Sequence, residues 1–207
     1  GTYYHSGTFM DRAFNEGMVE GRHIVQYGMA TPVFGEDEYD AVAAQGGKVY
    51  HHHEIRRDGV EAIFDKIYED LADIDLVYVS FDIDTFDMSY APGTGSSSPI
   101  GARPEDLFPM LREFAATKTI VGVDFVEYNP FFDNAGKQTA RLMRRTIFQF
   151  LTGIALNLQI TLGTINSLLL NLSIDKYKTC FYLFMSSSMS FGILFQFLLY
   201  KTFTLLV

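Results

Sequence analysis

The chain has 207 residues, of which 48% are hydrophobic and 20% are charged, and these are ordinary values for a globular protein with a sizeable core. Its formal net charge of −9 argues against nucleic acid as a partner. The single cysteine, Cys180, excludes a disulfide framework within the chain and favours a reducing compartment, so we expect a cytoplasmic protein.

Residues 1–155 alternate strand and helix patterns. Short apolar runs rich in β-branched and aromatic residues predict strands, and apolar residues at four-residue spacing predict amphipathic helices. Nearly continuous apolar strands separated by helices indicate a mainly parallel sheet that helices cover on both faces, and chemistry in such folds lies at the carboxyl ends of the strands. In chain order we expect strand 24–29, helix 37–45, strand 48–51, helix 60–73, strand 75–81, helix 104–116, strand 119–126 and helix 136–155.

Composition changes abruptly near Leu156. Residues 1–155 carry a net charge of −11, whereas 156–207 contain only four charged residues and two uncharged runs long enough to span a bilayer. We therefore expect one domain at 1–155 and an apolar tail at 156–207. Three interpretations of the tail remain open: membrane-associated structure, packing within a larger assembly, or non-native sequence from a gene-model error. A membrane partner is expected only if the tail is native.

Two aspartates follow the strand 75–81. Residues two apart in an extended strand point the same way, so Asp82 and Asp84 are expected to project from one face. Adjacent carboxylates repel each other unless a cation lies between them, and hard oxygen ligands suit Mn²⁺ or Mg²⁺. Taken alone, the pair is equally compatible with a solvated strand end.

Glu127 and His5 are weaker candidates. Glu127 follows the strand 119–126 and could accept two parallel hydrogen bonds from a planar guanidinium group, or it could cap a helix. His5 precedes a glycine-containing turn and could shuttle protons near neutral pH, although a lone histidine is more often structural. The three histidines at 51–53 would alternate sides of a strand and so could not all face one metal ion.

Together these motifs resemble the arginase/agmatinase (ureohydrolase) family. The resemblance covers about residues 1–155. It rests on Ser-Phe-Asp-Ile-Asp-Thr-Phe-Asp with Ala-Pro-Gly-Thr-Gly at 80–95, Asp-Phe-Val-Glu-Tyr-Asn-Pro at 124–130, Thr-Ala-Arg-Leu-Met-Arg-Arg at 139–145, and the segment His5–Gly17. The Gly-Thr-Gly form is more similar to agmatinases than to animal arginases.

The resemblance implies an α/β/α sandwich with two Mn²⁺ ions at the strand ends, in a homo-oligomer that hydrolyses a small guanidino compound and releases urea. Asp82 and Asp84 would then be metal ligands, Glu127 the guanidinium anchor and His5 the proton shuttle. A hydroxide made from metal-bridged water would attack the guanidinium carbon. The substrate could be agmatine, another guanidino compound, guanidine itself or formiminoglutamate.

The sequence also departs from the family pattern. The Gly-Gly-Asp-His and Asp-Ala-His-x-Asp motifs, which supply the other metal ligands, are absent, and we expect them upstream of His5 in a longer chain. Ser6 stands where many members place the glycine after the histidine. We therefore predict that this chain binds metal poorly and is nearly inactive. The rival interpretation is a truncated pseudo-enzyme that acts as a binding or regulatory subunit, tethered to a membrane if the tail is native.

Overall fold

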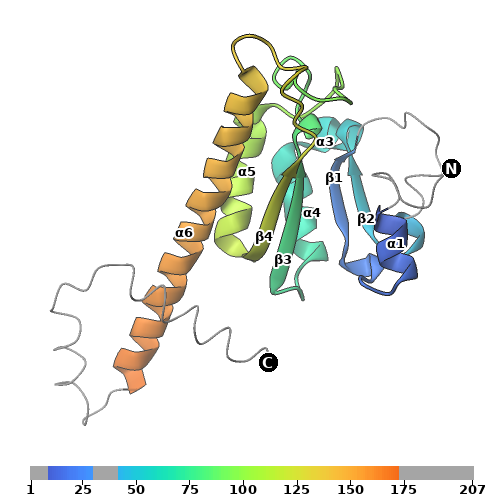
Figure 1. Ribbon diagram of the computed structural model, residues 1–207. Coiled ribbons are helices and arrows are strands. Elements are labelled where there is room, and N and C mark those ends of the chain that lie inside the picture. The colour runs from blue at the N-terminus through green and yellow to red at the C-terminus, as the bar shows by residue number, and fades with distance from the viewer. Residues whose placement is uncertain (1–8, 30–41, 173–207) are drawn as a thin grey trace. The chain divides into compact units, whose positions relative to one another are not determined.

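The computed structural model describes residues 9–29 and 42–172 (Figure 1). The chain divides into two compact units, Gly1–Gln159 and Ile160–Val207, and the last helix runs through the boundary between them. The described elements are α1 (Phe9–Asn15), the 3-10 helix η2 (Gly21–His23), β1 (Val25–Met29), β2 (Lys48–His51), α3 (His52–Asp58), α4 (Val60–Asp70), β3 (Leu76–Asp82), the 3-10 helix η3 (Ile83–Thr85), α5 (Pro104–Thr117), β4 (Thr119–Val126) and α6 (Gln138–Leu172).

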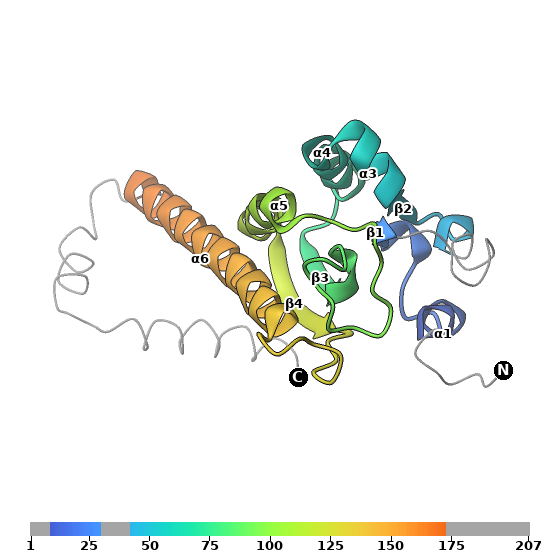
Figure 2. The same cartoon turned by 90° about the horizontal axis from the view of Figure 1, so that it is seen from above.

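The strands form two parallel pairs, β1 with β2 and β3 with β4. The α/β class with parallel strands is thus confirmed, although the described strands do not join into the one sheet that the sequence predicts. Both views place β3 and β1 as the inner strands, with β4 and β2 outside them (Figures 1 and 2). The carboxyl ends of β3 and β1 approach each other closely, because a Cβ on Gly28 would lie 2.4 Å from Oγ1 of Thr85.

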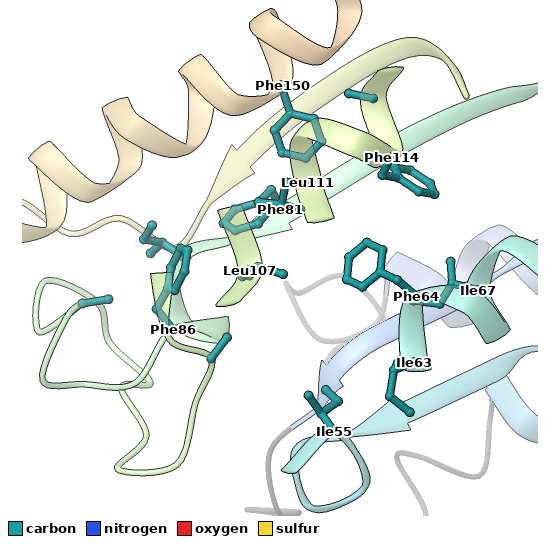
Figure 3. Close-up of a cluster of buried hydrophobic side chains, with 14 of the residues drawn as sticks. Ile55, Ile63, Phe64, Ile67, Phe81, Phe86, Leu107, Leu111, Phe114 and Phe150 are labelled. Atoms are coloured by element: carbon teal, nitrogen blue, oxygen red, sulfur yellow. The ribbon is translucent and has the colours of Figure 1, made fainter. Parts of the chain in front are cut away.

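The core lies on one side of β3 and β4. Phe81 of β3 contacts Phe125 of β4 and Phe150 of α6, with ring centroids 5.8 and 6.0 Å away (Figure 3). Helices α4 and α5 extend the cluster with side chains that include Ile63 and Leu107, which are 0% and 1% exposed. Burying such side chains is the main source of stability, at roughly 1.5–3 kcal/mol for each one.

The opposite face of these strands is open in the part of the chain that the structure describes. Leu76, Tyr78 and Val121 are 63%, 62% and 59% exposed. Within the described residues, helices cover one face of β3 and β4 and leave these three side chains on the other face exposed. The alternation of side chains along each strand sends every second residue to the face that no described helix covers.

Helix α6 packs closely against α5. A Cβ on Gly153 would lie 2.3 Å from the backbone oxygen of Arg112, so only glycine allows this approach. Asn157 adds a hydrogen bond by donating from Nδ2 to the backbone oxygen of Ala116 at 2.9 Å. The stretch Gln138–Ile165 is also long and apolar enough to cross a membrane, which for a single helix is weak evidence.

Several expected elements differ from the observed ones. Helix α3 is not predicted by the sequence, and it starts at His52 because His51 and Glu54 form a reciprocal capping box that turns the chain out of β2. Helix α5 begins at Pro104 as expected, and α6 extends far beyond the predicted end at 155 because the following residues contain no proline. Of the expected helix 37–45, residues 42–44 are helical, and residues 37–41 lie outside the described residues.

Candidate functional site

Asp82 and Asp84 lie at the carboxyl end of β3. Asp82 is the last residue of the strand, and its Oδ1 accepts a hydrogen bond of 2.9 Å from the backbone N–H of Asp84. Asp84 belongs to the 3-10 turn η3, so the expectation that both residues project from one face of an extended strand is wrong in its geometry. The turn still brings the two carboxyl groups close enough that, in addition to burial, the charge of Asp84 raises the pKa of Asp82.

The pair is electrostatically strained. Burial raises the pKa of Asp82 to about 8, and the charges of Asp84 and Glu127 add to this effect. Burial, together with the charge of Glu127, raises the pKa of Asp84 as well. Two adjacent, half-buried carboxyl groups resist being ionised together when no cation balances them. A divalent cation would balance both charges, so the two oxygen donors fit a hard metal ion.

Glu127 lies beside this pair. The last residue pair of the ladder between β3 and β4 is Asp82 with Val126, so Glu127 leaves β4 at the edge where Asp82 leaves β3. Its φ of 65° lies in the left-handed region, which costs a residue with a Cβ of the order of 1 kcal/mol. Strained backbone of this kind is concentrated at functional sites. The side chain is exposed and thus accessible to a ligand.

A network of hydrogen bonds holds the loop around the site. The fully buried Thr139, at the start of α6, accepts a hydrogen bond of 2.7 Å at Oγ1 from the N–H of Gly93. The carboxylate of Asp133 accepts from the N–H groups of Thr139 and Ala140, at 3.0 and 3.1 Å. Asn129, two residues after Glu127, donates from its backbone to the oxygen of Gly93 at 2.8 Å. The Ala-Pro-Gly-Thr-Gly loop is thereby tied both to α6 and to the segment after Glu127.

The sequence did not predict the supporting residues. An aspartate a few residues before a helix, as in Asp133, is a recognisable helix-start signal, but its partners are visible only in three dimensions. His5 lies outside the described residues. Within residues 9–29 and 42–172, no group of three or more His, Cys, Asp or Glu side chains is placed to hold a metal ion.

The three consecutive histidines do not converge. They lie at the junction of β2 and α3 rather than along a strand, which corrects the geometry assumed from the sequence. The rings of His51 and His53 stack at 5.4 Å, whereas His52 is buried with 4% of its surface exposed. The three histidine side chains therefore lie in different environments.

Comparison with known proteins gives matches to several hydrolases of guanidino compounds. Residues 1–153 match the model of the Arginase family. The mitochondrial agmatinase of Gallus gallus is 32% identical over 148 residues, which are 72% of this chain and 42% of that protein. The guanidinopropionase of Pseudomonas aeruginosa is 33% identical over 153 residues, covering 73% and 47%.

Solved structures of related proteins share the fold. Proclavaminate amidinohydrolase from Streptomyces clavuligerus superposes with a TM-score of 0.69 at 29% identity, over 76% of this chain and 51% of that one. Trypanosoma cruzi formiminoglutamase, solved with Mn²⁺, shares the fold with a TM-score of 0.64 at 22% identity, over 72% and 50%. The chain spans about half the length of the relatives that it matches.

Proposed function

Because the chain belongs to the arginase family, we propose that its carboxylate site serves the metal-dependent hydrolysis of a guanidino compound with release of urea. The observation that carries this proposal is the meeting of Asp82, Asp84 and Glu127 at one edge of β3 and β4. The repulsion among the half-buried Asp82 and Asp84 and the exposed Glu127 favours the binding of cations, both metallic and organic.

Asp82 and Asp84 are the residues that would hold Mn²⁺. Burial and the neighbouring charges raise the pKa of both groups, and loss of their protons leaves two adjacent carboxylates as ligands. When bound, Mn²⁺ activates water for attack on the guanidinium carbon and stabilises the charge that develops there. The Mn²⁺ in the related formiminoglutamase supports this choice of metal.

Glu127 and His5 would serve the substrate. The exposed carboxylate of Glu127 can accept two parallel hydrogen bonds from a guanidinium group and so fix its plane. His5 would move a proton to the leaving amine, a role that rests on the sequence resemblance. Agmatine is the substrate that we favour, because agmatinases are among the relatives, with guanidino acids as the next choice.

The ligand set limits what this chain does by itself. Two carboxylates supply too few ligands to hold a pair of Mn²⁺ ions tightly, so we propose that the chain by itself hydrolyses guanidino compounds slowly. For the same reason, a binding or regulatory role is the second candidate function. Stoichiometric retention of two ions after purification with excess Mn²⁺ would contradict the proposal that the chain has too few ligands for two Mn²⁺ ions.

The proposed function is tested by urea release. The purified chain is assayed with agmatine, guanidinobutyrate and guanidinopropionate in excess Mn²⁺, beside the variants Asp84→Asn and Glu127→Gln. Slow release that both substitutions abolish would support hydrolysis at this site. Release that neither substitution changes would contradict the proposal, and binding of agmatine without any release would favour the regulatory role.

A further inference from the structure

His52 is a buried histidine that the proposed function does not use. It is the first residue of α3 and is 4% exposed, whereas the neighbouring His53 is exposed. A buried position such as this one is ordinarily filled by an apolar side chain, because a buried polar atom without a partner costs about 1–3 kcal/mol. The presence of histidine here needs a physical reason.

The ring of His52 holds the turn that carries Asp84. It hydrogen-bonds to the backbone of Thr85, the last residue of η3. This bond raises the pKa of the ring, so a ring N–H donates and the carbonyl oxygen of Thr85 accepts. The same oxygen accepts the N–H of Ala102 at 2.7 Å. The residue that follows Asp84 is therefore fixed from two separate elements.

The backbone of β1 also lies close to Thr85 and to the ring of His52. Gly28 has a φ of +78°, and a Cβ at this position would lie 2.4 Å from Oγ1 of Thr85 and 3.4 Å from Cε1 of His52. Any larger residue would push Thr85 out of its place, whereas its contact with His52 would be an ordinary one. Burial lowers the pKa of His52, which favours the neutral ring.

We propose that His52 is a positioning residue that fixes the turn Ile83–Thr85, so that the carboxylate of Asp84 is held in place to bind a divalent cation together with Asp82. The inference rests on the proposed metal role of Asp84. Side chains that orient metal ligands in this way commonly change metal affinity by about 10–100-fold when they are removed.

Two substitutions separate the hydrogen bond from the space that the ring fills. His52→Phe keeps an aromatic ring but loses the N–H donor. His52→Asn loses the ring but keeps a side-chain N–H donor. Amide hydrogen exchange without metal reports on the turn through the N–H groups of Phe86 and Ala102. The N–H of Lys48, which bonds to Ile24 at the start of β2, is the control. Titration with MnCl₂, followed by the electron paramagnetic resonance of free Mn²⁺, gives the metal affinity.

For His52→Phe we expect exchange at Phe86 and Ala102 to rise about tenfold and Mn²⁺ affinity to fall by about tenfold, with Lys48 unchanged. His52→Asn should restore most of the protection from exchange at the turn and most of the Mn²⁺ affinity. Unchanged exchange at the turn, or an equal rise at Lys48, would overturn the positioning role. If Asp84→Asn binds Mn²⁺ as tightly as the unsubstituted chain, the metal role of Asp84 fails, and this result is independent of the exchange measurement.

Discussion

Asp82 lies directly opposite Val126 in the parallel ladder of β3 and β4, and this register brings Glu127 to the edge where the two aspartates lie. A shift of one residue would send Glu127 to the other face of the sheet, because the side chains alternate. The site thus depends on strand pairing as much as on the identity of its residues. Four predictions test its parts.

Glu127 combines a functional side chain with a strained backbone, and substitutions separate the two. Glu127→Gly should raise the free energy of unfolding by about 1 kcal/mol, because glycine adopts a φ of 65° without cost. Glu127→Gln should leave stability nearly unchanged. Urea denaturation measures both variants, and lower stability of the glycine variant would contradict the assigned strain. Agmatine affinity, measured by calorimetry, should fall in both variants.

Asp82 should make stability depend on pH when no divalent cation is present. Its pKa in the folded state is raised from the ordinary value of 3.8 to about 8, so protonation favours the folded state. This contribution is fully present below about pH 4 and is lost as the pH rises to about 8. We expect a loss of roughly 1–3 kcal/mol across this window, after allowance for solvent screening.

The control for the pH experiment is Asp82→Asn, which keeps an oxygen that can accept the N–H of Asp84 but has no proton to lose. Thermal unfolding of both proteins between pH 4 and pH 8.5 gives the comparison. The difference between the melting temperatures of the two proteins should shrink when Mn²⁺ is added. Parallel curves for the two proteins would contradict the assignment of the raised pKa to Asp82.

Thr139 should be essential for holding the Ala-Pro-Gly-Thr-Gly loop. Thr139→Val fills the same space but leaves the N–H of Gly93 without its partner, at a cost of about 1–3 kcal/mol. Thr139→Ser keeps the hydroxyl group and should recover most of this loss. Guanidinium denaturation measures the free energies, and equal losses in both variants would show that the hydrogen bond is unimportant.

Gly153 should be required for the close packing of α6 against α5. Gly153→Ala places a Cβ 2.3 Å from the backbone oxygen of Arg112, which should destabilise the protein by about 1–3 kcal/mol. The matched control is Gly163→Ala in the same helix, where no atom lies within 4 Å of the added Cβ. That change should stabilise the helix by about 1 kcal/mol at most. The melting temperatures of the two variants should therefore move in opposite directions.

The sequence predicts those parts of the structure that local patterns determine. Pro104 with two acidic residues behind it marks the start of α5, and the apolar run before Asp82 marks β3. The strand positions and the acidic residues at their ends follow from such patterns. The fold class follows from their alternation along the chain.

The parts that the sequence does not predict depend on contacts between distant residues. Thr139 and Gly93 are 46 positions apart, and nothing near either one announces their hydrogen bond. The pairing of strands into two separate sheets is also a tertiary property. The alternation expected of a strand does not single out His52, because the chain at His52 has already turned into a helix.

The seating of α6 has a consequence for how this chain could meet a lipid bilayer. Phe150 and Gly153 belong to the stretch that is long and apolar enough to span one, yet both are buried against β3, β4 and α5. Moving this stretch into lipid would uncover Phe81 and Phe125 to water and open the cluster around them. Placing all of Gln138–Ile165 in a membrane would therefore require the packing around Phe150 and Gly153 to open.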